Sequence, residues 1–324
     1  MTTVVDAHRS DFDYSDKGGP SSFGDLLWRD HAGHNVVWLF HGGPDAPVVP
    51  LPTVPPAWHV RAAADFDGGV SDGNSDILWQ NDNGALAIWQ MEGATMAAVH
   101  ALPNPGPAWH LVGDNDFNLD FGDDILWQND NGALAMWTGI SAATGTVSGM
   151  IAGTQNPGSA WHVVGTGDTD GDFRADILWQ NNNGALALWE KPTFGAGTFT
   201  FNTVAALPSV DPSWHVKGMA DVSGDGRADI VFQHDSGAVV VWEMNGTTIT
   251  AANLVDLNPG PSWHIVGLRD LNNDGQADVL LQNDNGATAG WELYHSFIPG
   301  SATFEIMGEV ANDPDPNGHT WDLL

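Results

Sequence analysis

The sequence predicts an all-β fold, a six-bladed β-propeller with four-stranded blades, and three observations lead to this prediction. One motif recurs along the whole chain with a regular period. Within all copies but the first, short apolar runs are separated by Asn-Gly or Pro-Gly turns, which is typical of β-strands. The motif is also split between the two chain ends, and the two fragments complete one copy. A closed ring explains the split, because a blade shared by both termini leaves no open sheet edge.

The repeats are set in register by a Trp-His pair. The copy at Trp161 reads WHVVGTGDTDGDFRADILWQNNNGALALWE, and the others begin at Trp58, Trp109, Trp214 and Trp263. The chain ends in HTWDLL, where Trp321 opens a further copy that the N-terminal segment continues. We therefore expect one domain over residues 1–324. Its predicted blades are 321–324 with 1–57, then 58–108, 109–160, 161–213, 214–262 and 263–320.

Each copy is predicted to contain four strands. In the fourth copy they are WHVVG, DILWQ, GALALW and TFTFNTVAAL. An Asn-Gly turn joins the second strand to the third and indicates a tight hairpin in which both turn residues have positive φ. The ILW and ALALW runs are apolar without alternation, which favours strands covered on both faces by neighbouring blades.

An acidic loop of nine residues separates the first two strands. In four copies its positions 1, 3, 5 and 9 carry side-chain oxygens. Such oxygens suit calcium, which takes six to eight hard ligands, and the absence of nitrogen and sulfur ligands disfavours zinc and copper. We expect the main-chain carbonyl at position 7 to complete each site. The predicted ligands are Asp116, Asn118, Asp120, Gly122 and Asp124; Asp168, Asp170, Asp172, Arg174 and Asp176; Asp221, Ser223, Asp225, Arg227 and Asp229; and Asp270, Asn272, Asp274, Gln276 and Asp278.

Two copies depart from this spacing. The second loop offers Asp65, Asp67 and Asp76, with an insertion that can bring in Asp72, and the longer first loop offers Asp11, Asp13 and Asp25. The alternative for every such loop is a plain turn, in which Asp and Asn side chains accept local backbone N–H groups.

The loop together with its following strand, as in DTDGDFRADILW and DVSGDGRADIVF, resembles the FG-GAP or VCBS repeat of integrin-type and bacterial propellers. The resemblance extends over essentially the whole chain, although the FG and GAP portions themselves match poorly. It implies a propeller fold and calcium bound by the loop carboxylates named above.

The composition excludes several classes of protein. The formal net charge is −32, which disfavours nucleic acid and anionic membranes as partners, and favours bound divalent cations. There is no cysteine, so disulfides and thiolate sites are excluded. No apolar run has the length of a membrane helix, and the N-terminus lacks the pattern of a signal peptide. Calcium loops nevertheless suit folding in a calcium-rich medium, so we expect an extracellular or cell-surface location.

The 16 tryptophans fall into three slots of the repeat. The strand-two slot accepts Phe232 and Leu281, which indicates core packing. The Trp-His slot is either core or a surface that stacks on a sugar ring, and its histidines are interpreted as buried hydrogen-bonding struts rather than as metal ligands or acid–base groups. The candidate ligand contacts are Trp58, His59, Trp109, His110, Trp161, His162, Trp214, His215, Trp263, His264 and Trp321.

The leading functional hypothesis is a multivalent calcium-binding recognition module, lectin-like or adhesive, with carbohydrate or a cell-surface glycan as partner. One alternative is a polysaccharide lyase or hydrolase whose chemistry uses asymmetric residues such as Arg29, His31, His34 and His41. No recognisable set of nucleophile, base and orienting group supports it. The other alternative is a calcium-stabilised structural or protein-docking domain. The sequence leaves the oligomeric state open.

Overall fold

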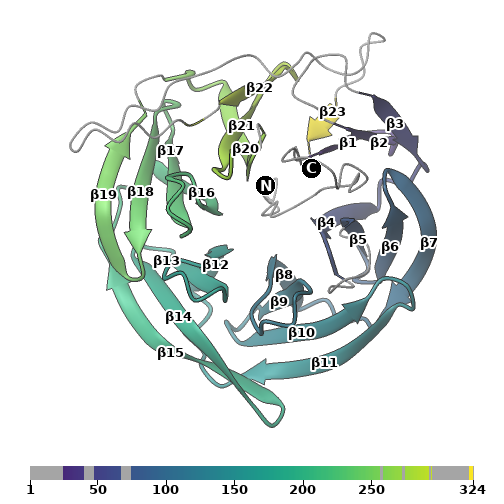
Figure 1. Cartoon of the computed structure of the whole chain (residues 1–324), viewed down its shortest axis with the longest axis horizontal. Coiled ribbons are helices and arrows are strands. Elements are labelled where there is room, and N and C mark those ends of the chain that lie inside the picture. Colours follow the sequence, from purple (N-terminus) through teal and green to yellow (C-terminus); the bar gives the residue numbers. More distant parts are fainter. Residues whose placement is uncertain are drawn as a thin grey trace.

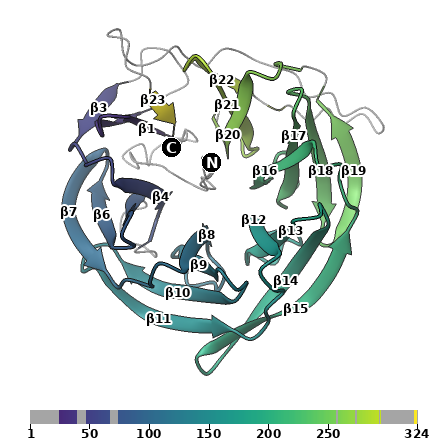
Figure 2. The same ribbon diagram turned by 180° about the vertical axis from the view of Figure 1, so that it is seen from behind.

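The structure is a computed structural model that describes residues 25–39, 47–66, 74–255, 258–271, 274–291 and 293, and the backbone of 321–323. In this part of the chain every regular element is a β-strand. Antiparallel units stand around a common centre, each with four strands except the β20-β21-β22 unit, for which three are described, and this arrangement is a β-propeller (Figures 1 and 2). No helix long and apolar enough to cross a membrane occurs among the described residues.

The strands repeat in the same order from the centre of the ring to its rim. The strands nearest the centre are β4 (Trp58–Ala64), β8 (Trp109–Asn115), β12 (Trp161–Gly167), β16 (Trp214–Ala220), β20 (Trp263–Arg269) and β23 (Trp321–Leu323). The second strands are β1 (Leu26–Asp30), β5 (Asp76–Asn81), β9 (Asp124–Asn129), β13 (Asp176–Asn181), β17 (Asp229–His234) and β21 (Asp278–Asn283). The third strands are β2 (Asn35–Trp38), β6 (Leu86–Glu92), β10 (Leu134–Ser141), β14 (Leu186–Gly195), β18 (Val239–Asn245) and β22 (Thr288–Trp291). The outer strands are β3 (Val48–Leu51), β7 (Thr95–Leu102), β11 (Thr146–Gly153), β15 (Thr198–Leu207) and β19 (Thr248–Leu254).

The two ends of the chain meet in one sheet. Strand β23 pairs antiparallel with β1, so that Trp321 lies opposite Asp30. The neighbouring core joins Leu26 and Trp28 of β1 to Leu271 and Leu280, which lie beside and within β21. The last described repeat therefore packs against the first.

The hydrophobic core consists of separate clusters between neighbouring units. The strand-two slot supplies the largest buried side chains, which include Trp79, Trp127 and Trp179 at 1% exposure or less. Phe232 and Leu281 are buried to the same extent, so the prediction of core packing for this slot is confirmed. The second strands are buried on both faces, as their continuous apolar runs predicted.

The Asn-Gly hairpins differ from the prediction in their backbone. In the second repeat Gly84 has φ of 86°, whereas Asn83 is not among the residues with positive φ. The Gly84 amide donates to the Asn81 carbonyl at 2.7 Å, and the Asn81 amide donates to Ala85 at 2.8 Å. This is the three-residue loop in which a turn is followed by glycine in the left-handed region. Only one residue of the turn needs positive φ, so the expectation of two was wrong.

The third and fourth units are joined at the rim, which the sequence did not predict. Strand β11 pairs parallel with β15, and the two units form one eight-stranded sheet. The cause is the length of the β14–β15 hairpin, in which each strand has ten residues. Gln155 extends the contact, because its side-chain amide donates to the Phe201 carbonyl and accepts from the Phe201 amide.

Candidate metal centre

The four regular acidic loops lie on one face of the ring, which we call the acidic-loop face. Each of the four connects an inner strand to a second strand, so in an antiparallel unit it shares its face with the turn between the third and outer strands. The Gly246 amide of one such turn accordingly donates to the Thr169 carbonyl in the loop of the neighbouring unit, at 2.7 Å. The Asn-Gly hairpins and the starts of the inner strands lie at the opposite face.

Position 1 of the loop organises the backbone around it. The Asp168 carboxylate accepts the amides of Gly171 at 2.7 Å, Asp172 at 3.2 Å and Phe173 at 2.6 Å. Asp221, Asp116 and Asp270 accept amides of their own loops in the same way. Position 5 accepts the amide of position 7 in all four regular loops. The plain-turn interpretation therefore describes part of what these side chains do.

Position 9 is buried, which a plain turn does not require. Asp124, Asp176, Asp229 and Asp278 each have 0% exposure. In the fourth loop, Oδ2 of Asp176 accepts the Thr169 amide at 2.9 Å and Oδ1 accepts the Lys191 amide of the third strand at 3.3 Å. Asp229 repeats this contact with Met244 of the third strand, and Asp278 accepts the amide of Leu293, just beyond the third strand. This residue fastens the loop to the blade.

The carboxylates of the fourth loop converge. One oxygen each from Asp168, Asp170 and Asp176 lies within 4.8 Å of the others, with Asp176 buried. Two further residues reach the cluster that the sequence did not assign to it. Lys191 places its Nζ 2.5 Å from Oδ2 of Asp170, and Glu190 is 3% exposed beside Thr169. The signal for Glu190 was present, because Glu follows the strand-three tryptophan in the fourth, fifth and sixth repeats.

The electrostatics of the loops favour a bound cation. Burial, with the charges of neighbouring carboxylates, raises the pKa of Asp124 to about 9 and that of Asp278 to about 8. Burial raises the pKa values of Asp176 and Asp229 to about 7. The hydrogen bonds that these carboxylates accept oppose the shift, and the charges of nearby carboxylates add to it. Several carboxylates held together out of water are stable as anions only with a counter-charge. All the donors are oxygens, so the residues fit calcium.

The predicted ligands are only partly described. Asn272 of the sixth loop lies outside the described residues, and so do Asp67, Asp72, Asp11 and Asp13 of the two irregular loops. Asp76 is buried and accepts the Met91 amide at 3.0 Å, as position 9 does elsewhere, and Asp65 precedes the undescribed segment. Buried Asp25 differs, because its carbonyl accepts a hydrogen bond from the buried guanidinium of Arg269. Burial lowers the pKa of Arg269 to about 10, and the negative charge of Asp25 opposes that shift.

Neighbouring loops are bonded to one another. The residue at position 8 of one loop donates its amide to the carbonyl of position 1 in the preceding loop. These bonds run from Asp123 to Asp65, from Ala175 to Asp116, from Ala228 to Asp168 and from Ala277 to Asp221. Position 8 adjoins the buried carboxylate at position 9, so the backbone next to that carboxylate is hydrogen-bonded to the preceding loop.

Two loops contain backbone strain. Position 6 has positive φ and is glycine in the fifth and sixth loops, but it is Phe121 in the third and Phe173 in the fourth, with φ of 70° and 68°. Both phenylalanines are 81% exposed, so no packing of their side chains compensates for the strain.

We predict that Phe173→Gly stabilises the protein by about 0.5–1 kcal/mol, because the cost of the left-handed conformation exceeds the entropy cost of glycine. Urea unfolding in calcium measures this, and Gly226→Phe is the matched reverse variant, expected to destabilise; a Phe173→Gly protein no more stable than the parent would contradict the strain.

The Trp-His slot lies on the face opposite the acidic loops, which we call the Trp-His face. The five described tryptophans of this slot are half-buried and pack against the core clusters. Trp321 is described in backbone only. Because the two faces are separate, the acidic loops and the Trp-His slots cannot form combined sites.

The histidines of this slot are exposed, so their interpretation as buried struts was wrong. His59, for example, has a side chain 46% exposed. Each nevertheless makes one hydrogen bond to the hairpin turn, between its Nε2 and an Oδ1 at 2.7–2.9 Å. The pairs are His59 with Asp82, His110 with Asp130, His162 with Asn182, His215 with Asp235 and His264 with Asp284. Four His-carboxylate pairs and one His-amide pair, that of His162 with Asn182, thus face solvent around the ring.

The comparisons with known proteins agree with the repeat. Residues 168–232 and 221–281 match the family model of the FG-GAP-like repeat. Residues 168–281 contain FG-GAP-like repeats. Each matched segment begins at position 1 of an acidic loop and ends at the strand-two slot of the next repeat, so the resemblance seen in the sequence is confirmed for this stretch. No curated protein matches the chain significantly.

Several solved structures are similar in fold. The structure of BBS1N in complex with ARL6DN, soaked with lead, has 12% identity and a TM-score of 0.43, over 90% of this chain and 81% of that one. The Dos1 propeller has 11% identity and a TM-score of 0.41, over 90% and 68% of the two chains. Human WBSCR16 has 13% identity and a TM-score of 0.42, over 83% and 74%.

Proposed function

We propose that this protein is a calcium-binding recognition propeller that acts outside the cell and presents its Trp-His face to a glycan. We take the ring as six blades, one for each Trp-His position of the sequence and its C-terminal counterpart Trp321. The observation that carries the proposal is the convergence of Asp168, Asp170 and Asp176, with Asp176 buried. Because the contacts at positions 1, 5 and 9 are repeated in the other regular loops, we extend the proposed calcium site to those loops.

The calcium part is tested by counting ions. Calorimetric titration of the chelator-treated protein should give one fewer bound calcium for Asp176→Asn, which retains the size of the side chain and removes its charge. Asp235→Asn is the matched control, because it removes an exposed carboxylate from the opposite face. Equal stoichiometry in the parent and Asp176→Asn would contradict a site in the fourth loop.

The glycan part is supported by the Trp-His face. Half-buried tryptophans next to exposed histidines and carboxylates repeat around the ring, and such repetition makes weak individual sites act together. A glycan array in calcium should show binding that is lost when His59, His110, His162, His215 and His264 are replaced by alanine. Phe121→Ser with Phe173→Ser is the control on the other face. An array without binding would contradict a lectin.

A second candidate function is protein docking through the acidic-loop face. Phe121 and Phe173 favour it, since both are 81% exposed on adjacent loops and exposed strained residues cluster at functional sites. Loss of cell-surface binding in the double serine variant, with the alanine variant of the Trp-His face unaffected, would favour this candidate over the lectin.

Two of the residues that the lyase or hydrolase alternative would use are held in hydrogen bonds within the first unit. Buried Arg29 donates to Asn35 at 3.1 Å and to the carbonyls of Val54 and Pro55, and lies 5.1 Å from the Trp79 ring. His34 is bonded to Asp30 at 2.6 Å. His41 lies outside the described residues. Because Arg29 and His34 hold the first unit together, we do not propose catalysis there.

A further inference from the structure

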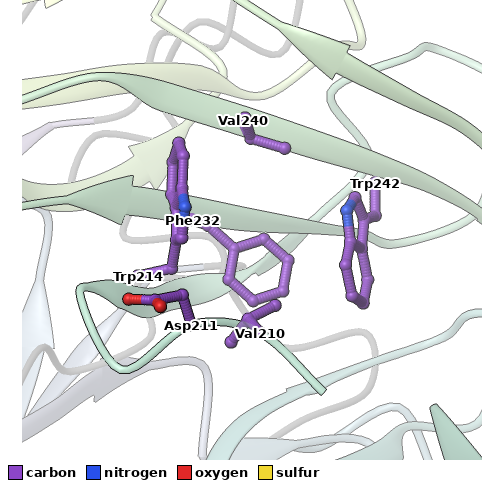
Figure 3. Close-up of a pocket in the computed structure, with 6 residues that line it drawn as sticks. All are labelled: Val210, Asp211, Trp214, Phe232, Val240 and Trp242. Atoms are coloured by element: carbon purple, nitrogen blue, oxygen red, sulfur yellow. The ribbon is translucent and has the colours of Figure 1, made fainter. Parts of the chain in front are cut away.

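The fifth repeat contains a cavity of about 290 Å³ on the Trp-His side of the blade, at the linker before β16. It is lined by Val210, Asp211, Trp214, Phe232, Val240 and Trp242 (Figure 3). Trp214 and Trp242 stand on either side of Phe232, and the walls are almost entirely apolar. Neither the calcium loops nor the repeated His-carboxylate pairs account for this cavity.

The cavity occurs where the fifth repeat departs from the others. Phe232 replaces the larger tryptophan that fills the strand-two slot in the first four repeats. Val210 and Asp211 replace the Pro-Gly pair of three other linkers. Trp242 is only half-buried, whereas its equivalents Trp189 and Trp291 are 7% and 5% exposed. The sixth repeat also lacks the strand-two tryptophan, but there the neighbouring Trp291 remains buried.

The aromatic walls are held in place. The Phe232 and Trp242 rings are tilted at 58°, with centroids 4.7 Å apart, and Trp214 meets the His234 ring edge-on at 4.9 Å. His234 is itself a departure, since the Asn-Gly hairpins of the second, third, fourth and sixth repeats have asparagine at this position. Its Nδ1 accepts the Ser236 amide at 3.0 Å, and this bond orients the ring beneath Trp214. Fixed aromatic walls lower the entropy cost of binding.

The rim carries negative charge. Asp211 is exposed, and its Oδ1 accepts the Ser213 amide at 3.0 Å and the Ser213 hydroxyl at 2.6 Å. These bonds lower the pKa of Asp211, so the carboxylate is ionised at neutral pH. The whole chain adds to this field, with a formal charge of −32. An anion is therefore disfavoured, and a sugar would find few hydrogen-bond partners on the apolar walls.

We propose that this cavity binds a small alkylated ammonium ion, with its methyl groups between Trp214, Trp242 and Phe232 and its charge toward Asp211. Aromatic faces attract such cations through their quadrupole, and quaternary ammonium groups combine an apolar surface with a positive charge. The volume suits a ligand of the size of choline. The site is independent of calcium, and it shares Trp214 with the residues of the glycan proposal.

Proton NMR tests the site with two probes, choline and 3,3-dimethyl-1-butanol, its neutral isostere. Choline methyl signals should move upfield on titration with the protein, because the methyl groups lie over aromatic rings. Choline should bind at least fivefold more tightly than the isostere. Equal affinity for both probes would overturn the proposal in favour of a purely apolar cavity, and no shift for either would overturn it altogether.

Three variants locate the effect. Phe232→Trp restores the side chain that other repeats have, so it should fold and abolish binding, with its melting temperature as the check on folding. Asp211→Asn is at the surface and retains the acceptor for Ser213. It should weaken the binding of choline at least fivefold and leave the affinity for the isostere unchanged. Asp130→Asn removes an exposed carboxylate from another blade and should change neither affinity. If Asp130→Asn weakened choline as much as Asp211→Asn, the overall charge and not the cavity would be responsible.

Discussion

Removing divalent cations should lower the melting temperature of this protein by about 10 °C or more. A filled site stabilises the folded chain by about 2.7 kcal/mol when free calcium is a hundred times the dissociation constant. One kcal/mol shifts the melting temperature of a large domain by about 2 °C or more, so two occupied loops suffice. Four loops have the regular spacing, and in each of them the buried carboxylate at position 9 accepts a backbone amide of its own loop.

Circular dichroism melts in chelator and in 1 mM calcium measure this effect. Magnesium is the informative control, because it demands octahedral geometry and retains its waters, and it should restore less than calcium. Asp176→Asn should reduce the calcium-dependent part, whereas Asp235→Asn should leave it intact. A chelated protein that melts at the same temperature as the calcium form would show that the loops are plain turns.

Much of the fold followed from patterns repeated in the sequence. A Trp-His pair, an acidic loop and an Asn-Gly hairpin at a regular period predicted the strands, and their order in each unit is the one observed. The spacing of the loop carboxylates was predictable because the backbone of one tight loop brings alternate residues together. Burial of the strand-two tryptophans followed from their replacement by Phe232 and Leu281.

The remainder depended on contacts between residues distant in the sequence. Lys191 reaches Asp170 because the third strand returns beside the loop, and no spacing rule indicates this. The histidines of the Trp-His slot lie next to half-buried tryptophans in sequence yet point to solvent, since the hairpin turn supplies an exposed carboxylate or amide oxygen. The separation of the two faces, and the cavity beneath Phe232, follow from how strands end and pack rather than from any motif.

The metal-free protein should become less stable as the pH rises from about 4 to about 9. Asp124, Asp176, Asp229 and Asp278 have folded pKa values of about 7 to about 9, above the ordinary value of 3.8. A folded state with raised carboxyl pKa values binds more protons than the unfolded state throughout this interval. Their stabilising contribution is therefore complete below pH 3.8 and is lost as the pH passes the folded values. Melting temperatures measured in chelator across this range give the slope of stability against pH.

Calcium should reverse the sign of that slope, because it binds the carboxylates that protons would otherwise occupy. The stabilisation by calcium is then largest at pH 8 and shrinks toward pH 5. The repulsion among the many negative charges of this chain also makes the folded state more stable at acidic pH. A matched control is therefore needed. Replacing Asp82, Asp130, Asp235 and Asp284 by asparagine removes four exposed charges from the Trp-His face and should leave most of the slope. Replacing the four buried aspartates by asparagine should flatten it, and equal slopes in the two variants would assign the effect to net charge rather than to the loops.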